Sequence, residues 1–94
     1  MTFIAEKDPL TANAIIQVLY VLNDELRLKR RQIELRLFSR GVPIFRTRKA
    51  MRVAREEGWI VKSPLDRKYT VSHEGRKVLR MSMLGLVAVN GVGE

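Results

Sequence analysis

The segment from residue 41 to 63, GVPIFRTRKAMRVAREEGWIVKS, restricts the fold of this chain more than any other stretch. Within it, small and apolar residues recur at the spacing of one face of an α-helix, which predicts a helix over residues 44–57. The residues of this face are Ile44, Thr47, Ala50, Met51 and Ala54. Gly58 ends the helical pattern, and the WIVKS that follows is rich in residues that favour strands. The fold therefore has to join a helix directly to a β-strand.

The opposite face of this predicted helix is basic. A rotation of about 100° per residue places Arg48, Lys49 and Arg52 away from the apolar face. Arg46 and Arg55 lie on the flanks of the same basic face. The pattern predicts a helix that is buried on one side and cationic on the other. A charged helix face that is merely solvated is the alternative interpretation.

Two helices and a short strand are predicted before this segment. Asp8, followed by a proline, marks the start of a helix over residues 9–25 and is expected to cap it. Alternating apolar and basic residues at 26–29 permit a small strand. The second helix begins at about Arg30 and ends at Gly41, which suits a left-handed terminal residue. We expect its inward-facing side chains to be Ile33, Leu37 and Phe38.

A hairpin and a last helix are predicted after the basic helix. Residues 59–72 hold two short strand patterns around a basic turn at 64–68. Ser72 is expected to cap a helix over residues 73–90, whose second half is apolar all round and has to be buried on every side. In so short a chain we expect a second copy of the protein to cover it, and folding back onto its own domain is the alternative. The predicted dimer contacts are Leu79, Met83, Leu84, Leu86 and Val87.

Positive charge is concentrated in one part of the chain. The net charge is +8, and the window 27–52 holds ten Lys or Arg residues against one acid, Glu34. Such a charge distribution favours a phosphate-rich polymer as the partner. The N-terminus does not look like a signal peptide, and no apolar stretch has the length of a membrane helix. We therefore expect a soluble, cytoplasmic protein that binds no membrane.

The sequence gives little support to catalytic or metal chemistry. It contains no Cys and a single His, His73, which excludes thiolate sites, His clusters and Cys–His pairs. Ser72, His73 and Glu74 are adjacent, so their side chains point in different directions and cannot form a hydrolytic relay. No glycine-rich phosphate loop is present. We expect no enzymatic activity, no metal and no cofactor, and no small-molecule ligand can be identified.

The chain resembles winged helix-turn-helix proteins. AREEGWIV at 54–61 matches the join between recognition helix and wing in MarR-like and PadR-like regulators, and YTVSHEGRKVL at 69–79 is similar to their exit from the wing. In size it resembles compact winged-helix proteins of archaea, their viruses and plasmids. It has Asp66 directly before Arg67, where MarR-like proteins have Asp-x-Arg. The resemblance implies one mainly α, α+β domain over residues 1–94, with a three-helix core, a two-stranded wing and a C-terminal dimerisation helix.

This resemblance and the charge pattern predict a homodimer that binds double-stranded DNA sequence-specifically, as a transcriptional regulator, with helix 44–57 in the major groove. A winged-helix module that binds RNA or a protein assembly is the alternative. Phe45 is expected either in the core, which is favoured, or on a thymine methyl, and Trp59 is expected in the core. The predicted DNA contacts are Arg48, Lys49 and Arg52 at base edges, Arg46, Arg55, Arg30 and Arg31 at phosphates, Phe45, and Arg67 and Lys68 at the wing tip.

Overall fold

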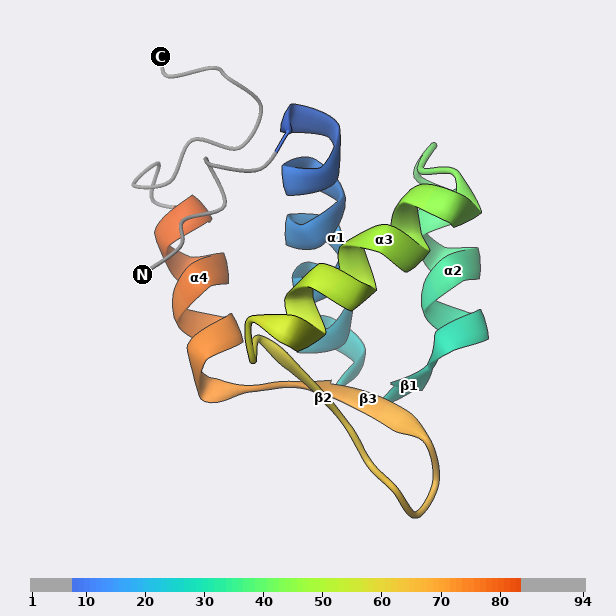
Figure 1. Cartoon of the computed structure of the whole chain (residues 1–94), viewed down its shortest axis with the longest axis vertical. Coiled ribbons are helices and arrows are strands. Elements are labelled where there is room, and N and C mark those ends of the chain that lie inside the picture. Colours follow the sequence, from blue (N-terminus) through green and yellow to red (C-terminus); the bar gives the residue numbers. More distant parts are fainter. Residues whose placement is uncertain (1–7, 84–94) are drawn as a thin grey trace.

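The computed structural model describes residues 8–83, which form a small, mainly helical α+β fold of four helices and three strands (Figure 1). Residues 84–90 of the predicted last helix lie outside this range. In chain order the elements are α1 Pro9–Glu25, β1 Leu28–Lys29, α2 Arg30–Phe38, α3 Ile44–Glu56, β2 Ile60–Lys62, β3 Lys68–Val71 and α4 His73–Met83.

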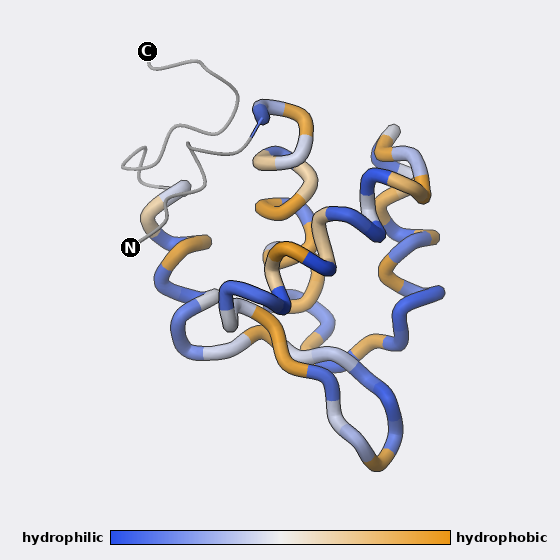
Figure 2. The backbone as a smooth tube through the Cα atoms, viewed as in Figure 1, coloured by the Kyte–Doolittle hydropathy of each residue, from blue (hydrophilic) through white to orange (hydrophobic). Residues whose placement is uncertain are grey.

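Helix α1 is the centre of the core, since it contacts α2, α3, α4 and β3 (Figure 1). Its start is as predicted, because the Asp8 carboxylate accepts a hydrogen bond from the Thr11 backbone N–H at 2.9 Å. Much of its surface is apolar and buried, whereas hydrophilic and hydrophobic residues alternate along α3 (Figure 2). The buried residues of α1 are Thr11, Ala12, Ala14, Ile15, Val18, Leu19, Val21 and Leu22.

Helix α2 confirms two of its three predicted inward side chains. Ile33 and Leu37 are fully buried, but Phe38 is 62% exposed, so its predicted inward position was wrong. Phe38 is the last residue of the helix and lies one step of about 100° beyond the buried face. The chain then turns through Gly41, whose φ of 88° is the left-handed conformation expected there.

Helix α3 packs the predicted face against α1 and α2. Its buried residues are Thr47, Ala50, Met51 and Ala54. Ile44 of the same predicted face is 40% exposed, because it is the first residue of the helix and lies at the edge of the packed region. Small residues at two of the buried positions allow a close approach to α1.

The three strands form one antiparallel sheet in the order β1-β3-β2. Leu28 pairs with Tyr69, which attaches the two-residue β1 to the hairpin. Trp59 is 4% exposed and belongs to the core, as predicted. The turn between β2 and β3 extends away from the helices (Figure 1).

Helix α4 begins as predicted, since the Ser72 hydroxyl accepts a hydrogen bond from the Gly75 N–H at 3.0 Å. Val78 and Leu79 turn into the core. No helix within residues 8–83 is both long enough and apolar enough to cross a membrane.

Candidate functional site

Two adjoining hollows lie between α3, the start of α2 and the hairpin. The larger has a volume of about 480 Å³ and is lined by Arg30, Arg48, Met51, Arg52, Arg55, Glu56 and Tyr69. The smaller, of about 290 Å³, is lined by Lys29, Arg30, Arg31, Lys62, Asp66, Arg67 and Tyr69. Because Arg30 and Tyr69 line both, we treat the two hollows as one surface and call it the basic groove.

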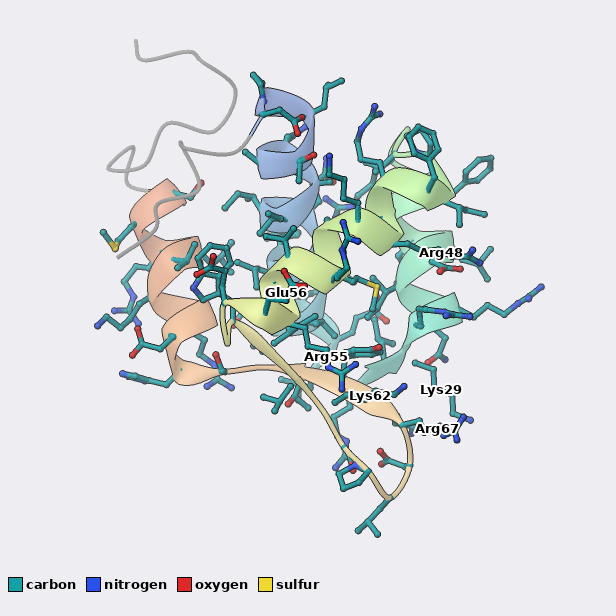
Figure 3. All side chains as sticks on the ribbon, in the orientation of Figure 1. Lys29, Arg48, Arg55, Glu56, Lys62 and Arg67 are labelled. Carbon is teal, nitrogen blue, oxygen red and sulfur yellow. The ribbon has the colours of Figure 1, made fainter. Side chains whose placement is uncertain are left out.

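The lining of the basic groove is dominated by cations. Eight Lys or Arg side chains line it, against the carboxylates of Glu56 and Asp66. The cations come from β1, α2, α3, β2 and the hairpin turn, so segments far apart in the sequence contribute to one surface. Figure 3 shows Lys29, Arg48, Arg55, Lys62 and Arg67 on the same side of the molecule. The surface therefore has a strongly positive field.

Arg48 is not a free cation. Its Nε donates a hydrogen bond of 2.8 Å to Oε2 of Glu34, and Arg30 Nε lies 3.4 Å from the same oxygen. The Glu34 side chain is only 6% exposed, whereas 58% of the Arg48 side chain is exposed. More than half of the Arg48 side chain thus stays exposed, although its Nε is held by a buried carboxylate. This ion pair was not predicted, although Glu34 was recognised as the one acid in the basic window.

Arg52 and Arg55 are exposed on α3 and pair with no carboxylate among residues 8–83. Lys49 lies beside the start of α1, with its Nζ 3.6 Å from the Asp8 carboxylate. Of the three predicted base-edge residues, Arg48 and Arg52 therefore line the basic groove and Lys49 does not.

Phe45 is exposed, and the favoured core position was wrong. Its side chain is at the outer start of α3 and 69% of the residue is exposed. The guanidinium of Arg46 lies over the Phe45 ring, 5.1 Å from its centre. Phe45, Arg48, Lys49 and Arg52 line a third hollow of about 310 Å³ on α3, which shares Arg48 and Arg52 with the basic groove. This third hollow continues the exposed basic face of α3 toward the N-terminal end of the helix.

The hairpin turn is held to the short segment between α1 and β1. Asp66 forms an ion pair with Arg27 and accepts a hydrogen bond from the Lys68 backbone N–H at 3.0 Å. This backbone hydrogen bond, followed by the charge of Arg27, holds the pKa of the Asp66 carboxylate below its ordinary value. Arg67 has a φ of 59° and lines the basic groove, whereas Lys68 is half-buried in β3 and does not line it.

Three residues at the site, Lys29, Lys62 and Leu65, are absent from the predicted contacts. Lys29 and Lys62 line the basic groove, and Lys62 Nζ lies 5.7 Å from the centre of the Tyr69 ring. Leu65, at the tip of the turn, is 94% exposed. The two lysines line the same hollow because β3 pairs with both β1 and β2, a sheet order that helical or strand periodicity does not predict.

The predicted dimer contacts fall mostly beyond the part of the chain that the structure describes. Leu84, Leu86 and Val87 lie outside it, as does the side chain of Met83. Leu79 is 4% exposed and packs in the core of its own chain, so it is not on a surface that a second copy can cover.

No three His, Cys, Asp or Glu side chains within the described residues gather where they could hold a metal ion. His73 is exposed at the start of α4, and the Ser72 hydroxyl beside it is engaged with Gly58 and Gly75. What the site offers chemically is a cationic surface with exposed guanidinium groups. Comparisons of the chain with protein-family models, with curated proteins and with solved structures found no match.

Proposed function

We propose that this protein binds double-stranded DNA, with α3 in the major groove and the hairpin on the neighbouring backbone, and that it acts as a transcriptional regulator. The observation that carries the proposal is the basic groove, which is lined by eight cations from a helix, a helix start and a hairpin. An α-helix fits the major groove, and cations beside it are attracted to the flanking phosphates. A helix joined to a projecting hairpin provides both kinds of contact.

The order of elements supports a winged helix-turn-helix assignment. The resemblance implies a helix, a short strand, two helices around a tight turn, a hairpin and a last helix, and residues 8–83 have that order. In this assignment α2 and α3 are the helix-turn-helix, and the turn around Gly41 joins them. The hairpin of β2 and β3 is the wing.

The residues of the basic groove divide by position into two roles. Arg48 and Arg52, on the exposed face of α3, contact base edges, where a good bidentate arginine–guanine pair contributes roughly 1–3 kcal/mol of discrimination. Arg31, at the start of α2, and Arg67, at the hairpin turn, contact phosphates on either side. Arg55, at the end of α3 nearest the hairpin, also contacts phosphate.

Salt dependence and two substitutions test this division. We expect the logarithm of the affinity for duplex DNA to fall linearly with the logarithm of the salt concentration, by about 0.9 per phosphate contact. Arg55→Ala should reduce this slope by about one contact. Arg52→Ala should weaken an enriched specific site about tenfold more than a random duplex. The measurement is fluorescence anisotropy of labelled duplexes over a salt series.

Arg76→Ala is the matched control, because it removes the same charge from an exposed position on α4 that does not line the basic groove. It should leave the slope unchanged. Equal effects of Arg55→Ala and Arg76→Ala would contradict the proposed surface. A structured RNA that displaces the duplex at equal concentration would favour the alternative, an RNA-binding module.

We also propose that the protein is a homodimer that reads two half-sites about 34–36 Å apart, one helical turn of DNA. The support is the apolar sequence from Met81 to Val89, which needs a partner surface. Truncation after Met83 tests this and keeps Met81, which packs on the core. We expect light scattering to give the mass of a dimer for the full chain and of a monomer for the truncated chain. A truncated chain that stays dimeric would contradict the assigned interface.

A further inference from the structure

Glu34 is a buried acid beneath a surface made of cations. It is the only Asp or Glu in the window 27–52, and its side chain is 6% exposed. A carboxylate lowers the positive potential that attracts DNA, so its position under the basic groove works against simple attraction of phosphate. What it does instead is hold Arg48, through the 2.8 Å hydrogen bond from Nε.

The geometry of this pair leaves the reading end of Arg48 available. A guanidinium has five N–H donors in a planar fork, and Glu34 takes only the one on Nε. Neither terminal amino group, Nη1 or Nη2, donates a hydrogen bond to another residue of the range 8–83, so both remain for another partner, and 58% of the side chain is exposed. Burial fixes the carboxylate itself, and the nearby Arg30 guanidinium at 3.4 Å provides a second counter-charge.

We propose that Glu34 is a positioning residue that holds Arg48 ready to recognise a guanine, an inference that rests on the proposed DNA-binding function. Guanine presents two acceptors, O6 and N7, in the major groove, which match the two amino groups of an arginine. A phosphate contact needs only a positive charge, whereas a base contact needs a defined direction. Fixing Arg48 before binding reduces the side-chain entropy that is lost on binding.

Arg52 provides the internal contrast. It lines the same groove, one helical turn further along α3, and pairs with no carboxylate of the described chain. Arg52 is therefore free to adapt to its contact, and Arg48 is not. Loss of Glu34 should affect recognition at the position read by Arg48 and leave the position read by Arg52 unchanged.

Two substitutions of similar volume separate positioning from charge. Glu34→Gln keeps an oxygen that accepts the Nε hydrogen bond, and Glu34→Met does not. Both remove one negative charge, so both should bind a random duplex somewhat more tightly than the wild type. Enrichment from a random duplex pool should show that Glu34→Gln keeps the guanine preference at one position. Glu34→Met should lose about tenfold of it, at the same position that Arg48→Lys alters.

The ¹⁵N NMR signal of the Arg48 Nε–H group adds a measurement that does not depend on DNA. It should be protected from exchange in the wild type and in Glu34→Gln, and should lose this protection in Glu34→Met. Thermal melting of both variants checks that they are folded. If Glu34 had only a structural role, its loss would lower the affinity at all base positions together. Equal base preferences in the Met and Gln variants would overturn the positioning role. A protected Nε–H signal in a protein that binds no duplex would instead refute the proposed function and leave the positioning intact.

Discussion

At the scale of single residues, Thr47 is an unusual member of the buried face of α3. It is 0% exposed, and its hydroxyl oxygen has no hydrogen-bond partner in the described structure. A buried hydroxyl without a partner costs about 1–3 kcal/mol of stability. Valine has nearly the same shape without the hydroxyl.

We therefore expect Thr47→Val to stabilise the protein by about 1 kcal/mol, which in a domain of this size raises Tm by about 4–8 °C. Thr47→Ser is the matched control, since it keeps the hydroxyl, removes the methyl group and should lower Tm. Calorimetry of the two variants and the wild type measures the difference. A lower Tm for Thr47→Val would show that the hydroxyl has a stabilising partner.

Three surface carboxylates make the stability of the fold depend on pH in the acid range. The Thr11 hydroxyl and N–H lower the pKa of Asp8, Arg36 lowers the pKa of Glu25, and the Lys68 N–H lowers the pKa of Asp66. A carboxylate whose pKa is lower in the folded state stabilises the fold above its unfolded pKa, here 3.8 for Asp and 4.5 for Glu. That contribution disappears as the pH falls through the lowered value.

We expect Tm to fall as the pH is lowered from about 5 toward 2, and to be nearly constant from about 5 to 7. Glu25→Gln should weaken this acid dependence, because the Glu25 pair with Arg36 no longer titrates. Melting curves over the pH series for both proteins provide the measurement. An unchanged acid dependence in Glu25→Gln would remove that pair from the explanation.

At the scale of elements, the join between the hairpin and α4 depends on one glycine. A Cβ atom on Gly75 would lie 2.1 Å from the Trp59 carbonyl oxygen and 2.8 Å from Cγ2 of Val71. Alanine normally stabilises a helix by about 1 kcal/mol relative to glycine. At Gly75 the contact with the Trp59 backbone reverses the expected sign of this change in stability.

Gly75→Ala should destabilise the protein by about 1–3 kcal/mol, because α4 has to move away from the sheet. The neighbouring Arg76→Ala, at an exposed position of the same helix, should change stability by less than about 0.5 kcal/mol. Urea unfolding of the two variants makes the comparison. A Gly75→Ala protein more stable than the wild type would contradict this packing.

Elements were predicted best where local signals coincide. Asp8 and the following proline fixed the start of α1, and helical spacing identified the buried face of α3. Helical spacing tells which side of a helix is apolar but not where the neighbouring elements end. It therefore did not predict that Phe38, Ile44 and Phe45 are exposed. The prediction of the site had the same limit.

The described residues bring Arg30, Arg31, Arg48, Arg52, Arg55 and Arg67 of the predicted set to the basic groove. Lys29 and Lys62 join them through the pairing of β3 with two strands, and the buried Glu34 pairs with two of the lining arginines, Arg30 and Arg48. The pairing of β1 with β3 and the pair of Glu34 with Arg48 are long-range contacts, so no local pattern in the sequence reports them.

At the scale of the whole molecule, the account depends on one surface. The core around α1 holds α2, α3 and the sheet so that their cations line the basic groove. Helix α4 lies on the other side of α1 from α2 (Figure 1). Duplex DNA that binds as proposed therefore contacts α3, the start of α2 and the hairpin turn, and leaves α4 free.

Titration of the ¹⁵N-labelled full chain with a short duplex, followed by NMR at low salt, tests this directly. The account predicts that the backbone signals of Arg31, Arg48, Arg52, Lys62 and Arg67 shift together and saturate at a fixed stoichiometry, while those of Arg76 and Lys77 on α4 do not move. Shifts centred on α4, or no shifts on addition of duplex, would contradict the central claim that the basic groove is a DNA-binding surface.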